Sequence, residues 1–108
     1  MKSVFAGISM AAILLSGNSA FASDEALALL KKHNCLGCHQ VDGPKVGPSY
    51  MDVAKKYRGN ESAAPRLEHK VANGGSGVWG KMPMPANYPH ASHEDIKIMV
   101  KYILSLAN

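Results

Sequence analysis

Cys35-Leu36-Gly37-Cys38-His39 is the stretch of this sequence that decides the fold. Two cysteines separated by two residues and followed at once by histidine form the attachment signature of a c-type haem. Each thiol can add to one vinyl group of the haem, and the imidazole of His39 is then held beneath the iron as an axial ligand. Cys35 and Cys38 are the two cysteines of the chain, so the motif uses all of its thiol chemistry.

Three other kinds of site could contain so short a motif. A thiol–disulfide exchange site is expected in a βαβ setting, and no strand pattern is found in the sequence. A structural zinc site needs four ligands, and the candidates beyond the motif are the distant His90 and His93. A disulfide between Cys35 and Cys38 would close too small a loop to add much stability. A haem site is therefore favoured.

Residues 1–22 have the features of a secretory signal peptide. Lys2 provides the positive start, and an apolar run extends from Val4 to Leu15. Ala20-Phe21-Ala22 offers small residues for cleavage, and the apolar run is too short to span a membrane. We therefore expect cleavage after Ala22, a mature domain of residues 23–108 and a location in the periplasm. Haem is attached to such motifs outside the cytoplasm, so the signal and the motif support each other.

The length and charge of the chain limit what it can do. A chain of 108 residues allows one small domain with a small core. A buried haem would stabilise such a domain, so we expect the haem-free chain to be largely unfolded. The formal net charge of +4 at pH 7 suits docking to an acidic protein surface. Scattered lysines without interleaved aromatic residues argue against nucleic-acid binding.

Four segments carry apolar residues at helical spacing, and no segment has the alternation of a strand. Serine followed by an acidic residue three positions later marks two N-termini, and glycine follows two C-termini. The sequence therefore predicts an all-α fold of about four helices. The expected helices run from Ser23 to Lys32, from Ser49 to Arg58, from Ala63 or Ala64 to Asn73, and from Ser92 to Ala107.

Two irregular stretches separate these helices, and we expect one on each side of a flat ligand. Residues 42–48 follow the motif and are punctuated by glycine and proline. Residues 74–90 form a loop that is long for so small a domain, and such loops are usually functional. This second loop holds the only tryptophan, Trp79, together with Met82 and Met84, so it is a candidate to wrap the cofactor.

An iron bound by His39 has one further axial position, and a methionine thioether would close it and raise the reduction potential. Met82 and Met84 both precede proline, so both favour extended backbone and point to the same side. These arguments hardly distinguish Met82 from Met84 as the axial ligand. Met84 has a slight advantage, because prolines on both sides fix its backbone and lower the entropy lost on ligation.

The mature chain resembles the class I cytochromes c, in their short bacterial form with one haem. The resemblance extends over almost all of residues 23–108 and includes Val46-Gly47-Pro48-Ser49-Tyr50, Gly77-Val78-Trp79-Gly80, Met82-Pro83-Met84-Pro85 and Lys101-Tyr102-Ile103-Leu104. It implies the cytochrome c fold, in which helices and two long loops surround one covalently bound haem c. It also implies that His39 and Met84 are the axial ligands of the iron.

The resemblance assigns further roles around the haem. It implies that the carbonyl of Pro48 binds the other ring nitrogen of His39, which would fix the imidazole and tune its basicity. Trp79 would donate its indole N–H to a haem propionate, and Asn87 would contact the methionine sulfur. Lys70 stands where relatives often carry a cation near a propionate, although lysine cannot make the bidentate bond of arginine. At Met82, some relatives carry an aliphatic residue instead.

We therefore expect a periplasmic electron carrier of a respiratory chain, monomeric and not an enzyme, with no membrane span in the mature protein. Lys45 and Lys81 would steer acidic redox partner proteins toward the exposed haem edge. The alternative function is a haem-based ligand sensor or peroxidase-like protein, which requires an open sixth position on the iron. A metal-free thiol–disulfide protein is a second alternative.

Overall fold

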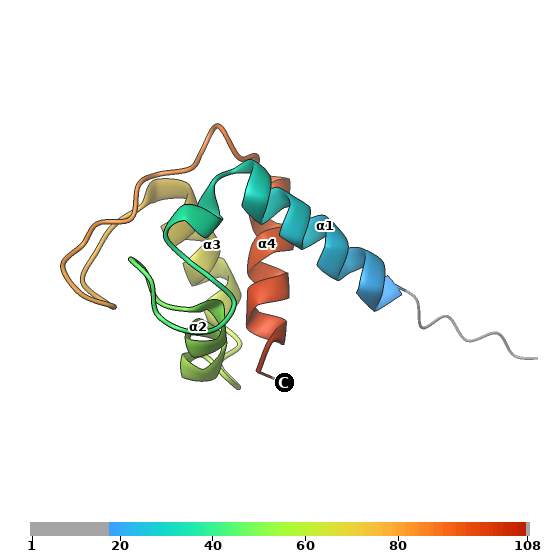
Figure 1. Ribbon diagram of the computed structural model, residues 1–108, viewed down its shortest axis with the longest axis horizontal. Helices are drawn as coiled ribbons and strands as arrows, with labels where there is room; N and C mark the ends of the chain where they lie inside the picture. Colours follow the sequence, from blue (N-terminus) through green and yellow to red (C-terminus); the bar gives the residue numbers. More distant parts are fainter. Residues whose placement is uncertain (1–17, 108) are drawn as a thin grey trace, which may run out of the picture.

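The computed structural model describes residues 18–107, which form four α-helices and one short 3₁₀ turn (Figure 1). Among these residues, the one β-type pairing is an isolated bridge between Gly75 and Met84. The predicted all-α fold is therefore confirmed. The elements are α1 (Asn18–Lys32), η1 (Cys35–Gly37), α2 (Tyr50–Lys56), α3 (Ala63–Asn73) and α4 (His93–Ser105).

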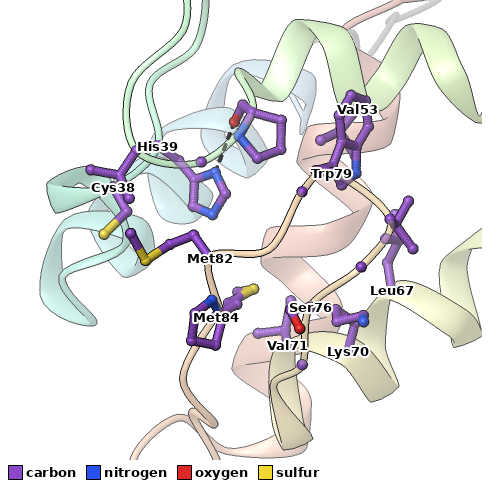
Figure 2. A pocket seen from close by; sticks show the side chains of 18 of the residues that line it. Cys38, His39, Val53, Leu67, Lys70, Val71, Ser76, Trp79, Met82 and Met84 are labelled. Carbon is purple, nitrogen blue, oxygen red and sulfur yellow. Dashed lines mark hydrogen bonds between the residues drawn. The ribbon is translucent and has the colours of Figure 1, made fainter.

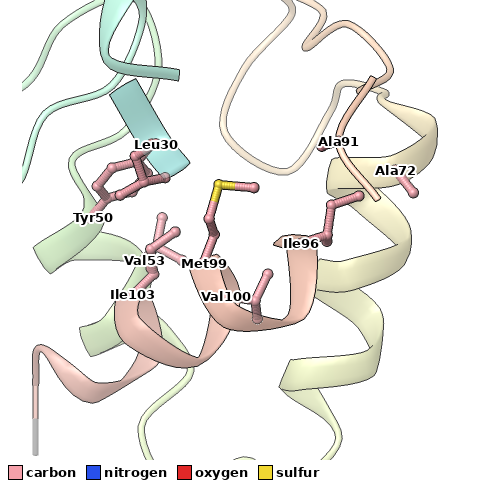
Figure 3. Packing of buried hydrophobic residues seen from close by; sticks show 9 residues of the cluster. All are labelled: Leu30, Tyr50, Val53, Ala72, Ala91, Ile96, Met99, Val100 and Ile103. Carbon is pink, nitrogen blue, oxygen red and sulfur yellow. The ribbon is translucent and has the colours of Figure 1, made fainter. Parts of the chain in front are cut away.

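Helix α4 is the centre of the packing, because α1, α2 and α3 each contact it. Its buried side chains recur at helical spacing and form one apolar face. Around this face lie buried residues of the other three helices, as Figure 3 shows. Since α2 and α3 both pack on α4 rather than on each other, space remains between them. The core residues drawn are Leu30, Tyr50, Val53, Ala72, Ala91, Ile96, Met99, Val100 and Ile103.

The predicted capping residues of two helices are confirmed. The Ser49 hydroxyl oxygen accepts a hydrogen bond from the backbone N–H of Asp52 at 3.0 Å, which begins α2. The Ser92 hydroxyl oxygen accepts one from the N–H of Asp95, also at 3.0 Å, which begins α4. In each case a side chain satisfies an N–H group that has no partner inside the helix.

Helix α1 differs from the prediction, because it already includes Asn18, the first residue that the structure describes, and not only the residues from Ser23 onward. Ser23 therefore lies inside α1 and does not cap it. The residues before Ser23 include two alanines, which favour helix, so nothing in this segment stops α1 from extending. The expected cleavage point after Ala22 falls within α1, and the rest of the predicted signal, residues 1–17, lies outside the described residues.

The two long loops lie on the side of the molecule away from α1, beside α2 and α3 (Figure 1). The first connects η1 to α2, and the second connects α3 to α4. No helix within residues 18–107 combines the length and the apolar character needed to cross a bilayer.

Candidate functional site

A cavity opens between the two long loops and helices α2, α3 and α4 (Figure 2). Its walls enclose about 1040 Å³, part of which is open to solvent. The helices contribute apolar side chains to its walls, as expected for a site that holds a large apolar ligand. These side chains are Tyr50, Val53, Leu67, Val71, Val100 and Ile103.

His39 stands at one wall of this cavity, and a hydrogen bond fixes its orientation. Its Nδ1 lies 2.8 Å from the backbone oxygen of Pro48. A carbonyl oxygen can only accept, so Nδ1 carries a hydrogen, and in the neutral imidazole Nε2 then keeps its lone pair. In Figure 2 the second ring nitrogen points toward the side of the cavity where Met82 and Met84 lie. The bond to Pro48 implied by the resemblance is thus formed, and it leaves Nε2 available to a metal.

Gly47 and Tyr50, for which no role at the site was predicted, lie against the His39 ring. A Cβ atom at Gly47 would lie 2.5 Å from Cε1, 2.9 Å from Nδ1 and 3.1 Å from Nε2 of His39. These distances to three consecutive ring atoms place that point above the ring face, so a side chain there would collide with the imidazole. The ring of Tyr50 stacks on His39, with 5.1 Å between the centroids and 22° between the planes.

The cysteine motif forms a tight turn at the end of α1. Asn34 adopts a left-handed conformation with φ of 61°, which redirects the chain after the helix. The N–H groups of Cys38 and His39 both donate to the carbonyl of Cys35, at 3.1 and 3.0 Å. Cys35 is half-buried and Cys38 is exposed, and burial raises the pKa of the Cys35 thiol. The turn therefore holds Cys35 and His39 together through the backbone, and it places Cys38 beside His39 in the wall of the cavity.

The second loop is held so that Met84 lies at the cavity. The N–H of Gly75 donates to the carbonyl of Met84 at 3.0 Å, and the N–H of Met84 donates to Gly75 at 2.8 Å. A Cβ atom at Gly74 would lie 2.5 Å from the Met84 carbonyl oxygen, so the loop backbone packs directly against this glycine. Met84 is half-buried, whereas Met82 is 67% exposed. The backbone hydrogen bonds to Gly75 and the lower exposure of the side chain both favour Met84 over Met82 as the thioether of the site.

Trp79 and Lys70 both line the cavity. The Lys70 ammonium lies against Gly75, where a Cβ atom would approach its nitrogen to 2.9 Å. Trp79 is 44% exposed, and the Lys56 ammonium of α2 lies 5.6 Å from the centroid of its ring. This cation–π contact, which was not predicted, links α2 to the second loop across the cavity.

Asn87 lies at the end of the second loop and is half-buried. Its amide nitrogen donates to the carbonyls of Val71 and Pro85, at 3.1 and 3.2 Å. Both amide hydrogens are used in these bonds. Asn87 therefore fastens the second loop to α3, and its contact with the methionine sulfur stays a prediction.

The residues of the cavity fit a covalently bound haem. Apolar walls suit the macrocycle, and Cys38 of the motif lines the same cavity. An imidazole from the first loop and a thioether from the second are the donors that haem iron takes in His/Met sites. Residues 18–107 contain no group of three or more His, Cys, Asp or Glu side chains that could hold a separate metal ion.

Known proteins share both the sequence and this architecture. The family model for cytochrome c matches residues 23–107. Cytochrome c-552 of Nitrosomonas europaea is 42% identical over 106 residues, which cover 98% of this chain and 99% of the relative. Cytochrome c-551 of Allochromatium vinosum is 50% identical over 80 residues, which cover 74% of this chain and 84% of the relative.

Solved structures agree with the sequence comparison. The crystal structure of wild-type Nitrosomonas europaea cytochrome c552 has a TM-score of 0.71 at 45% identity, and the match covers 74% of this chain and 98% of the other. The class 1 cytochrome MtoD from Sideroxydans lithotrophicus ES-1 has a TM-score of 0.70 at 40% identity, with 79% and 96% covered.

Proposed function

Since the chain belongs to the cytochrome c family and transfers electrons through a haem c attached to Cys35 and Cys38, we propose that His39 and Met84 are its two axial iron ligands. A bound haem supplies a one-electron ferric/ferrous couple. His39 presents Nε2 while its Nδ1 is tied to Pro48, so the ligand is oriented before the iron binds. Ligands that stay bound in both oxidation states keep the rearrangement on electron transfer small.

The observation that carries this proposal is the arrangement of donors in one cavity. The imidazole comes from the first loop and the thioether from the second, and both loops are held by backbone hydrogen bonds. Met84 is favoured over Met82 because the bridge to Gly75 fixes its backbone and because it is less exposed. A soft thioether also stabilises the ferrous state and so raises the reduction potential.

The absorption spectrum of the purified holoprotein tests the ligand assignment. A ferric haem bound by methionine shows a weak far-red band from sulfur-to-iron charge transfer. We expect this band in the wild type and in Met82→Ala, and its loss in Met84→Ala. A band that persists in Met84→Ala and disappears in Met82→Ala would assign the ligand to Met82 instead.

A haem-based sensor or peroxidase-like protein is not favoured, because the relatives are electron-carrier cytochromes. Such a protein needs an open sixth position, which the reduced wild type would reveal by binding carbon monoxide readily. We expect the reduced wild type to bind it poorly and Met84→Ala to bind it well. In the proposed role the protein transforms no substrate.

We further propose that this carrier works in the periplasm as a monomer and docks to acidic redox partners at the open side of the cavity. Apolar side chains surround that opening: Val46 is 56% exposed and Val78 is 53% exposed. Lysines flank them, and the ammonium of Lys45 is held beside the cysteine motif by donating to the carbonyl of Leu36 at 3.0 Å. A rim of positive charge around an apolar centre suits a partner with a negative rim.

A further inference from the structure

Tyr50 connects the hydrophobic core to the proposed iron ligand. It is 4% exposed and belongs to the core cluster with Leu30 and Met99. It also lines the cavity, and its ring stacks on that of His39 at 5.1 Å between centroids. A side chain held on several sides by the core can hold its neighbour in turn.

The start of α2 is fastened to the segment that follows His39. The N–H of Tyr50 donates to the carbonyl of Gln40, and the N–H of Met51 donates to the carbonyl of Val41, both at 2.9 Å. The first N–H groups of a helix have no partner inside it, so here they find partners on the chain next to His39. The position of the Tyr50 ring relative to the imidazole is thereby set by the backbone.

The hydrogen bond to Pro48 alone leaves the imidazole one degree of freedom. The imidazole can turn about its bond to Cβ, and one hydrogen bond at Nδ1 limits this rotation without stopping it. That rotation sets the plane of the ligand relative to the haem, and contact with a flat neighbour opposes it. The stacked Tyr50 ring and the Gly47 backbone are the groups that lie against the imidazole.

We propose that Tyr50 is a positioning residue that fixes the plane of the His39 imidazole by ring stacking. The proposal rests on the assignment of His39 as an axial ligand. Phenylalanine at position 50 would keep the stacking and lose the hydroxyl, whereas leucine would lose both.

The haem methyl resonances in the proton NMR spectrum of the ferric holoprotein test this proposal, because their order and spread depend on the planes of the axial ligands. We expect Tyr50→Phe to keep the wild-type pattern and Tyr50→Leu to reorder it. The matched control is Ile96→Ala, which removes a buried side chain of the same core that does not line the cavity. This control should lower stability and leave the methyl pattern unchanged.

Two results would overturn the proposal: a wild-type methyl pattern in Tyr50→Leu, or the same altered pattern in Tyr50→Phe as in Tyr50→Leu. If Tyr50→Leu does not take up haem, the ferrous wild type still decides. Nuclear Overhauser effects between the ring protons of Tyr50 and His39 are then required, and their absence contradicts the stacking. Absence of the far-red band in the wild type would instead contradict the His/Met assignment. Failure of the stacking proposal and failure of the ligand assignment are therefore distinguishable.

Discussion

The imidazole of His33 and the carboxylate of Asp95 join the end of α1 to the start of α4, with 3.3 Å between Nε2 and Oδ2. The His33 side chain is 8% exposed and that of Asp95 is 27% exposed, so the contact is partly shielded from water. It lies where the helix leading into the cysteine motif meets the central helix of the fold.

The first prediction concerns this contact. His33→Ala should lower the free energy of unfolding by about 1 kcal/mol, because a partly buried carboxylate loses its partner. Denaturant unfolding of the holoprotein measures the change. His69→Ala, which alters an exposed histidine of α3, should have little effect. Equal losses in the two variants would show that the contact does not stabilise the fold.

Gly47 gives the second prediction, since a Cβ atom there would lie 2.5 Å from the His39 ring. Gly47→Ala should move the imidazole or the loop and destabilise the holoprotein by about 1–3 kcal/mol. It should also alter the haem absorption spectrum. Gly37→Ala is the control, because a Cβ atom at Gly37 has no neighbour within 4 Å. Wild-type stability and spectrum in Gly47→Ala would contradict the close packing of Gly47 on the His39 ring.

The third prediction separates backbone strain from contact with the Met84 loop. Gly74 and Gly59 both have positive φ angles, 75° and 77°, so alanine is strained at both, at about 1–3 kcal/mol. Only at Gly74 would the added Cβ atom meet the loop, 2.5 Å from the Met84 carbonyl oxygen. Gly74→Ala should therefore weaken the far-red band, and Gly59→Ala should leave it intact. An intact band in both variants would show that Gly74 does not hold Met84.

Local signals in the sequence predicted the parts of the fold that depend on residues close together in the chain. The serine caps of α2 and α4 are of this kind, since donor and acceptor are three residues apart. The position of Asn87 was not predictable in this way, because its amide binds a carbonyl sixteen residues away on α3. The start of α1 was missed because the prediction began the helix at the expected cleavage point.

The same distinction between local contacts and contacts of distant segments applies to the site. The cysteine motif and the hydrogen bond from His39 to Pro48 were predicted from a short stretch of sequence together with a family resemblance. The stacking of Tyr50 and the contact of Lys56 with Trp79 depend on how the loops fold over one another. A tyrosine that begins a helix two residues after the Gly47-Pro48 pair was the one available signal for the stacking, and it is weak.

Electron transfer with an acidic redox partner gives the fourth prediction. If Lys45 and Lys81 steer the partner, rates should fall as ionic strength rises. Lys45→Gln and Lys81→Gln should each reduce the rate at low salt by a factor of roughly 2 to 5. Lys97→Gln, an exposed position on α4 away from the cavity, removes the same charge and should change the rate less. Rates independent of salt would rule out steering.

The fifth prediction concerns the chain without its haem. Within residues 18–107, α1, α2 and α3 each pack on α4, and the two loops line a cavity that is partly open to solvent. A small core leaves little free energy to maintain such a cavity, since water in it would contact apolar walls. The double variant Cys35→Ser and Cys38→Ser, purified without haem, should therefore lose most of its helical circular dichroism and its cooperative thermal transition. Cys35→Ser alone keeps one attachment point and should retain a transition at lower temperature. A haem-free double variant that melts cooperatively with wild-type helix content would show that the helices fold without the cofactor.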